Sequence, residues 1–180
     1  MEASAHSPHS HHEMPTLVIA RSDRGRLPVR LTSVEAGQLL RSVGRRFARR
    51  AEQEGRALDV AAEPGMELTV DPLRMEQALG NMVDNALRHG AGKVRLGALE
   101  RDGRIELRVG DEGGGFPDAF LAQAFERFAR ADEARARGGS GLGLAIVKAI
   151  ARAHGGLAGA ANRDGGADVW IELPGRRRRE

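Results

Sequence analysis

Three short stretches decide the fold of this 180-residue chain: NMVDNALRH at residues 81–89, DEGGGFP at residues 111–117 and GGSGLGLAIV at residues 138–147. The first has a helical pattern with two asparagines four residues apart, the second is Asp-x-Gly-x-Gly, and the third is Gly-x-Gly-x-Gly at the start of another helix. Each alone is a weak signal, because ordinary turns and hinges are also rich in glycine. Their occurrence in this order predicts a nucleotide-binding domain.

The first stretch lies on a predicted helix over residues 72–88, which begins with an Asp-Pro pair suited to an N-cap and a first helical turn. Gln77, Asn81 and Asn85 recur every four residues, so their amides line one face. A solvated polar stripe is the plainer interpretation, but asparagine lowers helix propensity and the glycine motifs accompany it. Amide oxygens suit a hard cation such as Mg²⁺ without adding charge.

Glycine dominates the second and third stretches. In the third, glycines at alternate positions open a helix, and their amides would form a nest for phosphate at the positive end of the helix dipole. A flexible hinge would explain one such glycine but not three. In the second, Asp111 follows a predicted strand, and the glycines after it let the backbone pass close to a planar ring.

In this combination the chain resembles the ATP-binding catalytic domain of sensor histidine kinases, within the superfamily that also holds gyrase, Hsp90 and MutL. The match runs from about Leu17 to Leu173. The resemblance implies an α/β (α+β) two-layer sandwich of the Bergerat type, with a mixed sheet of about five strands, three main helices on one face and a mobile ATP lid. It implies ATP and Mg²⁺ as cofactors.

The resemblance also implies a reaction: transfer of the γ-phosphate to a histidine on a separate dimerisation hairpin, for relay to an aspartate of a response regulator. Asn85 is expected to bind Mg²⁺ with Asn81 assisting, and Arg88 to lie near the phosphates as the third catalytic residue. Asp111 is expected to accept the exocyclic amine of adenine. The further nucleotide-binding positions are Gly113, Gly115, Phe116, Gly139, Ser140, Gly141, Leu142, Gly143 and Leu144.

Residues 112–139 show no sustained periodicity, and a connection of that length inside a compact domain is typical of a functional lid. It contains FERFAR at residues 125–130, which resembles the F-box, whose rings attach the lid to the body of the domain. Its arginines are candidates to reach the triphosphate, although arginines in such a loop are commonly solvated. The expected nucleotide contacts in the lid are Phe125, Arg127, Phe128 and Arg130.

Hydrophobic patterning predicts the other elements. One helix is expected from Thr32 to Gly55, and another is expected to be capped by Ser140 and to end at His154. Like His89, His154 ends its helix, where an imidazolium would suit the dipole. Asp102-Gly103 predicts a hairpin turn. Strands are expected near residues 57–61, 67–70, 94–99, 105–109, 157–161 and 167–173.

These patterns predict four segments along the chain. Residues 1–16, rich in His, Ser and Pro, are expected to be a disordered, tag-like segment or fragment end, with no ordered metal site. Residues 17–30 resemble the end of the dimerisation hairpin and its linker. The ATP-binding catalytic domain is expected over residues 31–174, followed by a basic tail at residues 175–180.

Composition limits the partners and the location. Removing the last five residues, four arginines and one glutamate, reduces 28 basic and 25 acidic side chains to 24 of each, so the body is formally neutral. Together with an aromatic content of 3%, this argues against nucleic-acid binding. Cysteine is absent, which suits a reducing cytoplasm. No apolar run approaches the roughly 18 residues of a membrane span.

We therefore expect a cytoplasmic domain without membrane contact of its own, in a full-length kinase that is membrane-anchored. The isolated domain is expected to be a monomer and the full-length kinase a dimer, with the hairpin and a response-regulator receiver domain as partners.

Asn81 bears on the reaction. Hydrolases of the superfamily place a glutamate there to accept a proton from the attacking water, and an amide cannot act as that base. The same residue weakens a second hypothesis, a stand-alone serine kinase of the anti-sigma-factor type. A third hypothesis, a degenerate adaptor, is disfavoured by the complete motifs. His12 lies between Pro8 and Pro15 without an apolar stripe, so we do not expect it to be the phosphoacceptor.

Overall fold

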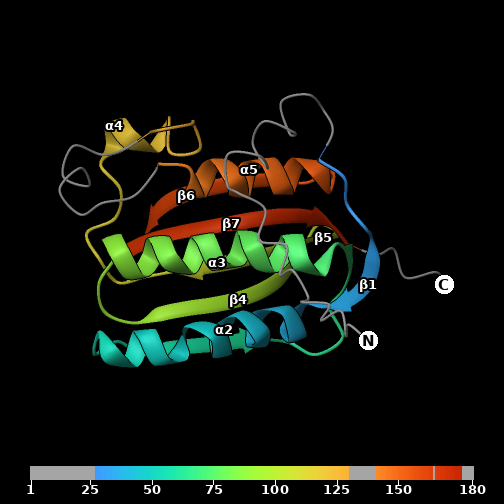
Figure 1. Ribbon diagram of the computed structural model, residues 1–180, viewed down its shortest axis with the longest axis horizontal. Coiled ribbons are helices and arrows are strands. Elements are labelled where there is room, and N and C mark those ends of the chain that lie inside the picture. The colour runs from blue at the N-terminus through green and yellow to red at the C-terminus, as the bar shows by residue number, and fades with distance from the viewer. Residues whose placement is uncertain (1–26, 130–140, 164, 176–180) are drawn as a thin grey trace, which may run out of the picture.

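A computed structural model describes residues 27–129, 141–163 and 165–175 (Figure 1). The strands form a five-stranded sheet in the order β2-β4-β5-β7-β6 and a separate pair, β1-β3. In chain order the elements are β1 (Thr32–Glu35), α2 (Ala36–Gln53), β2 (Leu58–Ala62), β3 (Glu67–Val70), α3 (Pro72–His89), β4 (Val94–Arg101), β5 (Arg104–Gly110), α4 (Asp118–Leu121), α5 (Gly143–Ala153), β6 (Leu157–Arg163) and β7 (Gly166–Pro174).

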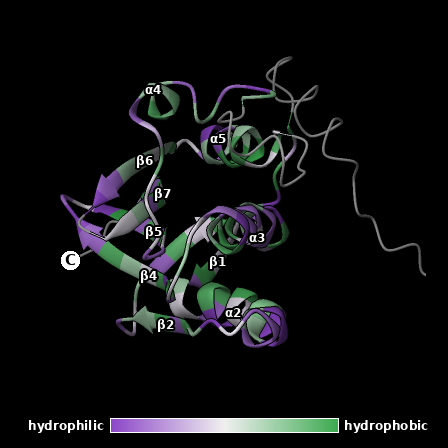
Figure 2. Cartoon of the chain, turned by 90° about the vertical axis from the view of Figure 1, so that its left-hand side faces the viewer, coloured by the Kyte–Doolittle hydropathy of each residue, from purple (hydrophilic) through white to green (hydrophobic). Residues whose placement is uncertain are grey.

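The molecule has two layers. Helices α2, α3 and α5 lie side by side on one face of the five-stranded sheet, and the other face has no helix over it among the described residues (Figure 2). β2 and β4 are parallel, whereas the other neighbours in the sheet are antiparallel. The predicted mixed sheet under three main helices is therefore confirmed, and α4 is a fourth, single-turn helix.

The core lies between these layers and is almost entirely aliphatic, as close packing of helices on a sheet requires. Helix α3 occupies the middle position, so its apolar residues are buried along most of its length. The largest fully buried side chains are Leu40, Val43, Leu68, Met75, Leu79, Met82, Leu96, Leu107, Ile150, Ile171 and Leu173. Within the described part of the chain, no helix is long and apolar enough to cross a membrane.

Local signals placed several elements correctly. Asp71 is the N-cap of α3, and its side chain accepts the N–H of Arg74 at 3.1 Å. Asp102 and Gly103 form the predicted turn between β4 and β5, with φ angles of 52° and 72°. Positive φ at both positions suits the twist of a tight hairpin.

The helix expected from Thr32 is wrong in its first turn. Residues 32–35 form β1, which pairs antiparallel with β3, and the helix begins at Ala36. Two of these residues, Thr32 and Val34, are β-branched and fit a strand. The backbone N–H of Ala36 then donates to Met66 just before β3, at 2.8 Å. Strand β3 therefore belongs to the two-stranded sheet with β1 and not to the five-stranded sheet.

The ends of α5 also differ from the sequence-based expectation. Leu142, not Ser140, occupies the N-cap position, and its side chain makes no cap hydrogen bond. At the other end, buried His154 accepts the N–H of Asp71 on Nε2 at 3.0 Å, and its Nδ1 lies 2.8 Å from the carbonyl oxygen of Ile150. An acceptor at Nε2 and a donor at Nδ1 describe a neutral ring. The expected imidazolium is therefore wrong for His154, which joins α5 to the start of α3.

Candidate nucleotide-binding site

The three sequence motifs meet at one end of the molecule. There the last turns of α3, the loop after β5 and the beginning of α5 lie near one another, on the left in Figure 1. The side chain of Asn81 donates from Nδ2 to the carbonyl oxygen of Gly143 at 3.3 Å. Asn85 lies one turn further along α3 and is half-buried. Residues that are distant in sequence are thus brought into direct contact.

Asp111 is held from both sides. Its backbone N–H donates to Ala167 in β7 at 3.0 Å, and its Oδ1 accepts the N–H of Gly113 at 2.8 Å. The residue is only 8% exposed. Among the described residues no hydrogen bond is made to its other carboxylate oxygen, Oδ2.

Gly113 serves backbone packing. A Cβ there would come within 2.8 Å of the amide nitrogen of Ala91 and 2.9 Å of the Cα of Gly90. A Cβ on Gly90 would in turn lie 2.3 Å from Cγ of Asp111. The turn after α3 is therefore pressed against the loop that carries Asp111. Gly90 and Ala91 belong to none of the three sequence motifs, so neither was expected at the site.

Phe116 is fixed by a residue that sequence reasoning missed. Asn162 in β6 accepts the backbone N–H of Phe116 on Oδ1 and donates from Nδ2 to its carbonyl oxygen, both at 2.7 Å. Gly115 has φ of 77°, and a Cβ there would lie 2.5 Å from Oδ1 of Asn162. A single amide thus anchors the beginning of the lid to the sheet.

We expect Asn162→Ala to loosen this anchor, because it removes both hydrogen bonds to Phe116. The loss of stability should be about 1 kcal/mol, since the pair is exposed to water. Hydrogen exchange should rise in residues 115–121 while the core of the sheet stays protected. Asn162→Asp, which keeps only the acceptor, should give an intermediate result, and equal exchange in all three chains would contradict the anchoring role.

The first half of the lid is more structured than expected. It contains α4, and the rings of Phe116 and Phe120 lie 5.8 Å apart. Phe125 packs against the core as predicted, but Phe128 is 68% exposed and does not attach the lid to the body. Its backbone N–H instead donates to Gly141 at 3.0 Å. The lid expectation is thus corrected for Phe128.

A charged pair also joins the lid to α5. Nζ of Lys148 donates to Oε1 of Glu126 at 2.8 Å. This hydrogen bond holds the pKa of the Glu126 carboxyl below its ordinary value. Because both partners border water, the pair contributes little to the global free energy of unfolding.

Three of the remaining predicted site residues, Arg130, Gly139 and Ser140, lie outside the described residues. The others are described. Arg127 is exposed, whereas Leu142 and Leu144 are buried in the core, so their side chains pack. Gly141 has φ of 65°, and a Cβ there would approach the Cα of Phe128 to 2.9 Å. At Gly143 a Cβ would meet nothing within 4 Å, so space remains beside the start of α5.

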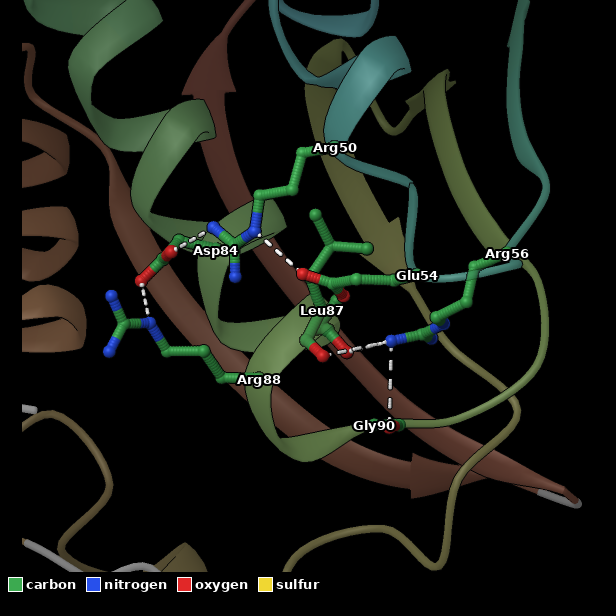
Figure 3. Close-up of polar contacts among 8 residues, drawn as sticks. Arg50, Glu54, Arg56, Asp84, Leu87, Arg88 and Gly90 are labelled. Atoms are coloured by element: carbon green, nitrogen blue, oxygen red, sulfur yellow. Dashed lines mark hydrogen bonds and ion pairs between the residues drawn. The ribbon is translucent and has the colours of Figure 1, made fainter. Parts of the chain in front are cut away.

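Arg88 forms an ion pair with Asp84 on the same helix. Its Nε lies 2.8 Å from Oδ2 of Asp84, and Nη1 of Arg50 lies 2.6 Å from Oδ1 of the same carboxylate (Figure 3). The hydrogen bond to Asp84, followed by one to Glu54, raises the pKa of Arg50. This ion pair uses only Nε of Arg88, and Arg50 also neutralises the Asp84 carboxylate.

The donor set at this end suits a hard cation only in part. The described residues contain no group of three or more His, Cys, Asp or Glu side chains that could hold a metal ion. Amide oxygens of Asn81 and Asn85 are hard ligands without charge. A site of this kind needs oxygens from a substrate to complete it, which fits Mg²⁺ bound together with phosphate groups.

Comparison with known proteins gives one sequence family. Residues 70–177 match the histidine kinase-, DNA gyrase B- and HSP90-like ATPase family. A probable sensor histidine kinase HK of Mycobacterium tuberculosis is 43% identical over 159 residues, which are 88% of this chain and 41% of that protein. The sensor histidine kinase component HK1 of the same species is 47% identical over 121 residues, which are 67% of this chain and 72% of that protein.

Among solved structures, full-length ShkA in complex with AMPPNP superposes with a TM-score of 0.79 at 34% identity. The match covers 89% of this chain and 34% of ShkA. The chain thus spans about a third of ShkA and less than half of the first M. tuberculosis kinase. From the family match and these relatives, the chain belongs to the histidine kinase-, DNA gyrase B- and HSP90-like ATPase family, as a catalytic ATP-binding domain of the sensor histidine kinases.

Proposed function

We propose that this chain binds Mg-ATP and transfers the γ-phosphate to a histidine of a separate dimerisation hairpin, for relay to an aspartate of a response regulator. The observation that carries the proposal is the hydrogen bond from Asn81 to Gly143, which joins the helix of amides to the glycine opening α5. Asp111 lies near the same end, and within the described residues only its Oδ1 accepts a hydrogen bond. Features suited to metal, phosphate and adenine therefore occur together.

In the proposed site, Asn85 holds Mg²⁺ with Asn81 assisting, and Asp111 accepts the adenine amine. Mg²⁺, when bound, neutralises charge on the phosphates. Gly139, Gly141, Gly143 and the backbone of Leu142 and Leu144 are proposed phosphate contacts, and Arg88 is the proposed cation near the phosphates. Gly113, Gly115, Phe116 and the lid residues Phe125, Arg127, Phe128 and Arg130 are proposed to border the nucleotide.

Phosphoryl transfer requires the domain to position the γ-phosphate and to stabilise its charge. Asn81 stands where a water-activating carboxylate would be needed, so transfer to a side chain is favoured over hydrolysis. A neutral imidazole is already a nucleophile near its ordinary pKa of about 6.5, so a histidine acceptor needs no such base. Both M. tuberculosis relatives are named sensor histidine kinases, which disfavours the anti-sigma-type serine kinase.

The partners and the setting are proposed on the same basis. Residues 31–174 would form the catalytic domain, and residues 17–30 would connect it to the acceptor hairpin. The proposed location is the cytoplasm, where ATP and a response-regulator receiver domain are available. The isolated domain is proposed to be monomeric and the full kinase dimeric through its hairpin.

Calorimetry of ADP binding separates the two main roles. Asp111→Asn should weaken ADP binding about tenfold without Mg²⁺, because an amide has one accepting oxygen and no charge. Asn85→Ala should leave that affinity within about twofold, and should instead remove the strengthening of binding by Mg²⁺. An equal loss for both variants without Mg²⁺ would show that the roles are assigned wrongly.

A further inference from the structure

One arginine outside all three motifs satisfies the end of α3. Arg56, between α2 and β2, donates from Nη1 to carbonyl oxygens in the last turn of α3 and to that of Gly90 (Figure 3). Its Nη2 and Nε donate to the carbonyl oxygens of the next two residues in the turn that follows. The acceptors are Ala86 at 2.8 Å, Leu87 at 3.1 Å, Gly90 at 3.5 Å, Ala91 at 2.8 Å and Gly92 at 2.7 Å.

The helix end explains part of this arrangement. The last carbonyls of a helix have no partners within it, and a cation there also favours the helix dipole. The planar guanidinium can serve several acceptors at once from a fixed geometry, which an ammonium group cannot do. However, Arg56 also bonds Ala91 and Gly92, which lie beyond the helix. Helix capping alone does not require those two contacts.

The turn at residues 90–92 contacts the loop that carries Asp111. The carbonyl oxygen of Ala91 accepts the N–H of Glu112 at 2.9 Å as well as the hydrogen bond from Arg56. Gly90 lies so close to Asp111 that a Cβ on it would be 2.3 Å from the carboxylate carbon. Ala91 therefore connects Arg56 to the residue next to Asp111.

The side chain of Glu112 makes two further contacts with residues that follow the turn at residues 90–92. Its Oε2 accepts the N–H of Lys93 at 2.9 Å, and its Oε1 is paired with Arg95. The hydrogen bond from Lys93, followed by the charge of Arg95, holds the pKa of the Glu112 carboxyl below its ordinary value of 4.5. At neutral pH Glu112 thus donates a hydrogen bond to the turn at residues 90–92 and accepts one from Lys93, just after that turn. Arg56 stabilises the same turn through its hydrogen bond to Ala91.

We propose that Arg56 is a positioning residue for adenine recognition, because it fixes the turn at residues 90–92 against which the Asp111 carboxylate is set. This inference rests on the proposed role of Asp111 in binding adenine. Arg56 itself does not touch the nucleotide. Its effect on affinity should therefore depend on the presence of the Asp111 carboxylate, which an effect on overall stability would not.

A double-mutant cycle on the 180-residue chain tests this dependence, with ADP as the ligand and no Mg²⁺. Asp111→Asn and Arg56→Ala should each weaken ADP binding about tenfold, and the double variant should bind little more weakly than Asp111→Asn alone. Arg56→Lys, with a single nitrogen, should restore only part of the affinity. The melting temperature of each variant is measured so that binding is compared on folded protein.

Arg50→Ala is the matched control, since Arg50 also links the end of α2 to α3 but contacts Asp84 and Glu54 instead of the turn. Its effect on ADP binding should be the same in the unaltered chain and in the Asp111→Asn variant. Independent, multiplying effects of Arg56→Ala and Asp111→Asn would overturn the positioning role. Unchanged binding in Asp111→Asn alone would overturn the adenine assignment, and this inference with it. If Arg56→Ala does not fold, the same cycle with Arg56→Lys decides.

Discussion

Asn85→Ala is expected to slow phosphotransfer to an acceptor hairpin about a hundredfold or more. Asn85 is the proposed Mg²⁺ ligand, and a bound metal supplies several kcal/mol of charge stabilisation, with about 1.36 kcal/mol for each factor of ten in rate. Alanine is a better helix former than asparagine, so α3 should stay folded. The measurement is the rate of labelled phosphate transfer at saturating ATP and Mg²⁺, with a separately supplied hairpin.

Gln77→Ala is the matched control, because Gln77 lies on the same face of α3 two turns earlier. Its amide oxygen accepts a hydrogen bond from Arg74 at 3.3 Å, toward the start of the helix. Transfer by this variant should stay within about twofold of the unaltered chain, because Gln77 is not among the proposed metal or phosphate ligands. Equal slowing by both alanine variants would show that the amide face acts through packing and not through a metal.

Gly166→Ala should destabilise the domain by about 3 kcal/mol or more, or prevent folding altogether. A Cβ on Gly166 would lie 1.7 Å from the carbonyl oxygen of Asp111 and 3.0 Å from the Cα of Glu112. Both are backbone atoms that cannot move aside without breaking the bond from Asp111 to Ala167. Because Gly166 has no Cβ, the start of β7 can approach Asp111 closely enough for the hydrogen bond from Asp111 to Ala167.

Gly165→Ala provides the comparison for Gly166→Ala. Gly165 has φ of 81°, but a Cβ there would meet nothing within 4 Å. Only backbone strain of about 1 to 2 kcal/mol is expected. Denaturant unfolding of the two variants measures the difference. Equal midpoints would mean that the close approach of Gly166 to Asp111 does not limit the fold.

Elements with a local cause were predictable from sequence. The Asp-Pro pair before α3 and the Asp102-Gly103 turn act within a few residues, and the structure has both where the sequence places them. The order of the three motifs identified the family before any contact was known, and the match over residues 70–177 agrees with it. The Asn81 contact to Gly143 also brings two motifs together, as a shared site requires.

Features that depend on distant contacts were not predictable. Asn162 holds Phe116 across 46 residues of sequence, and Arg56 reaches Ala86 across 30. Nothing near either residue indicates such a partner, because side-chain bonds to backbone carry no periodic pattern. The neutral ring of His154 likewise follows from a bond to Asp71, 83 residues away. β1 was missed for a related reason, since its partner β3 decides between strand and helix.

The central claim is that this chain is the ATP-using half of a histidine kinase, with its acceptor on another segment. The most direct test incubates the chain with labelled ATP and Mg²⁺, alone and with a dimerisation hairpin carrying the acceptor histidine. We expect no label on the chain alone and label on the hairpin that acid removes and base does not, as phosphohistidine behaves. Acid-stable label on a serine, or acid-labile label on the chain alone that is lost with His12→Ala, would contradict the claim.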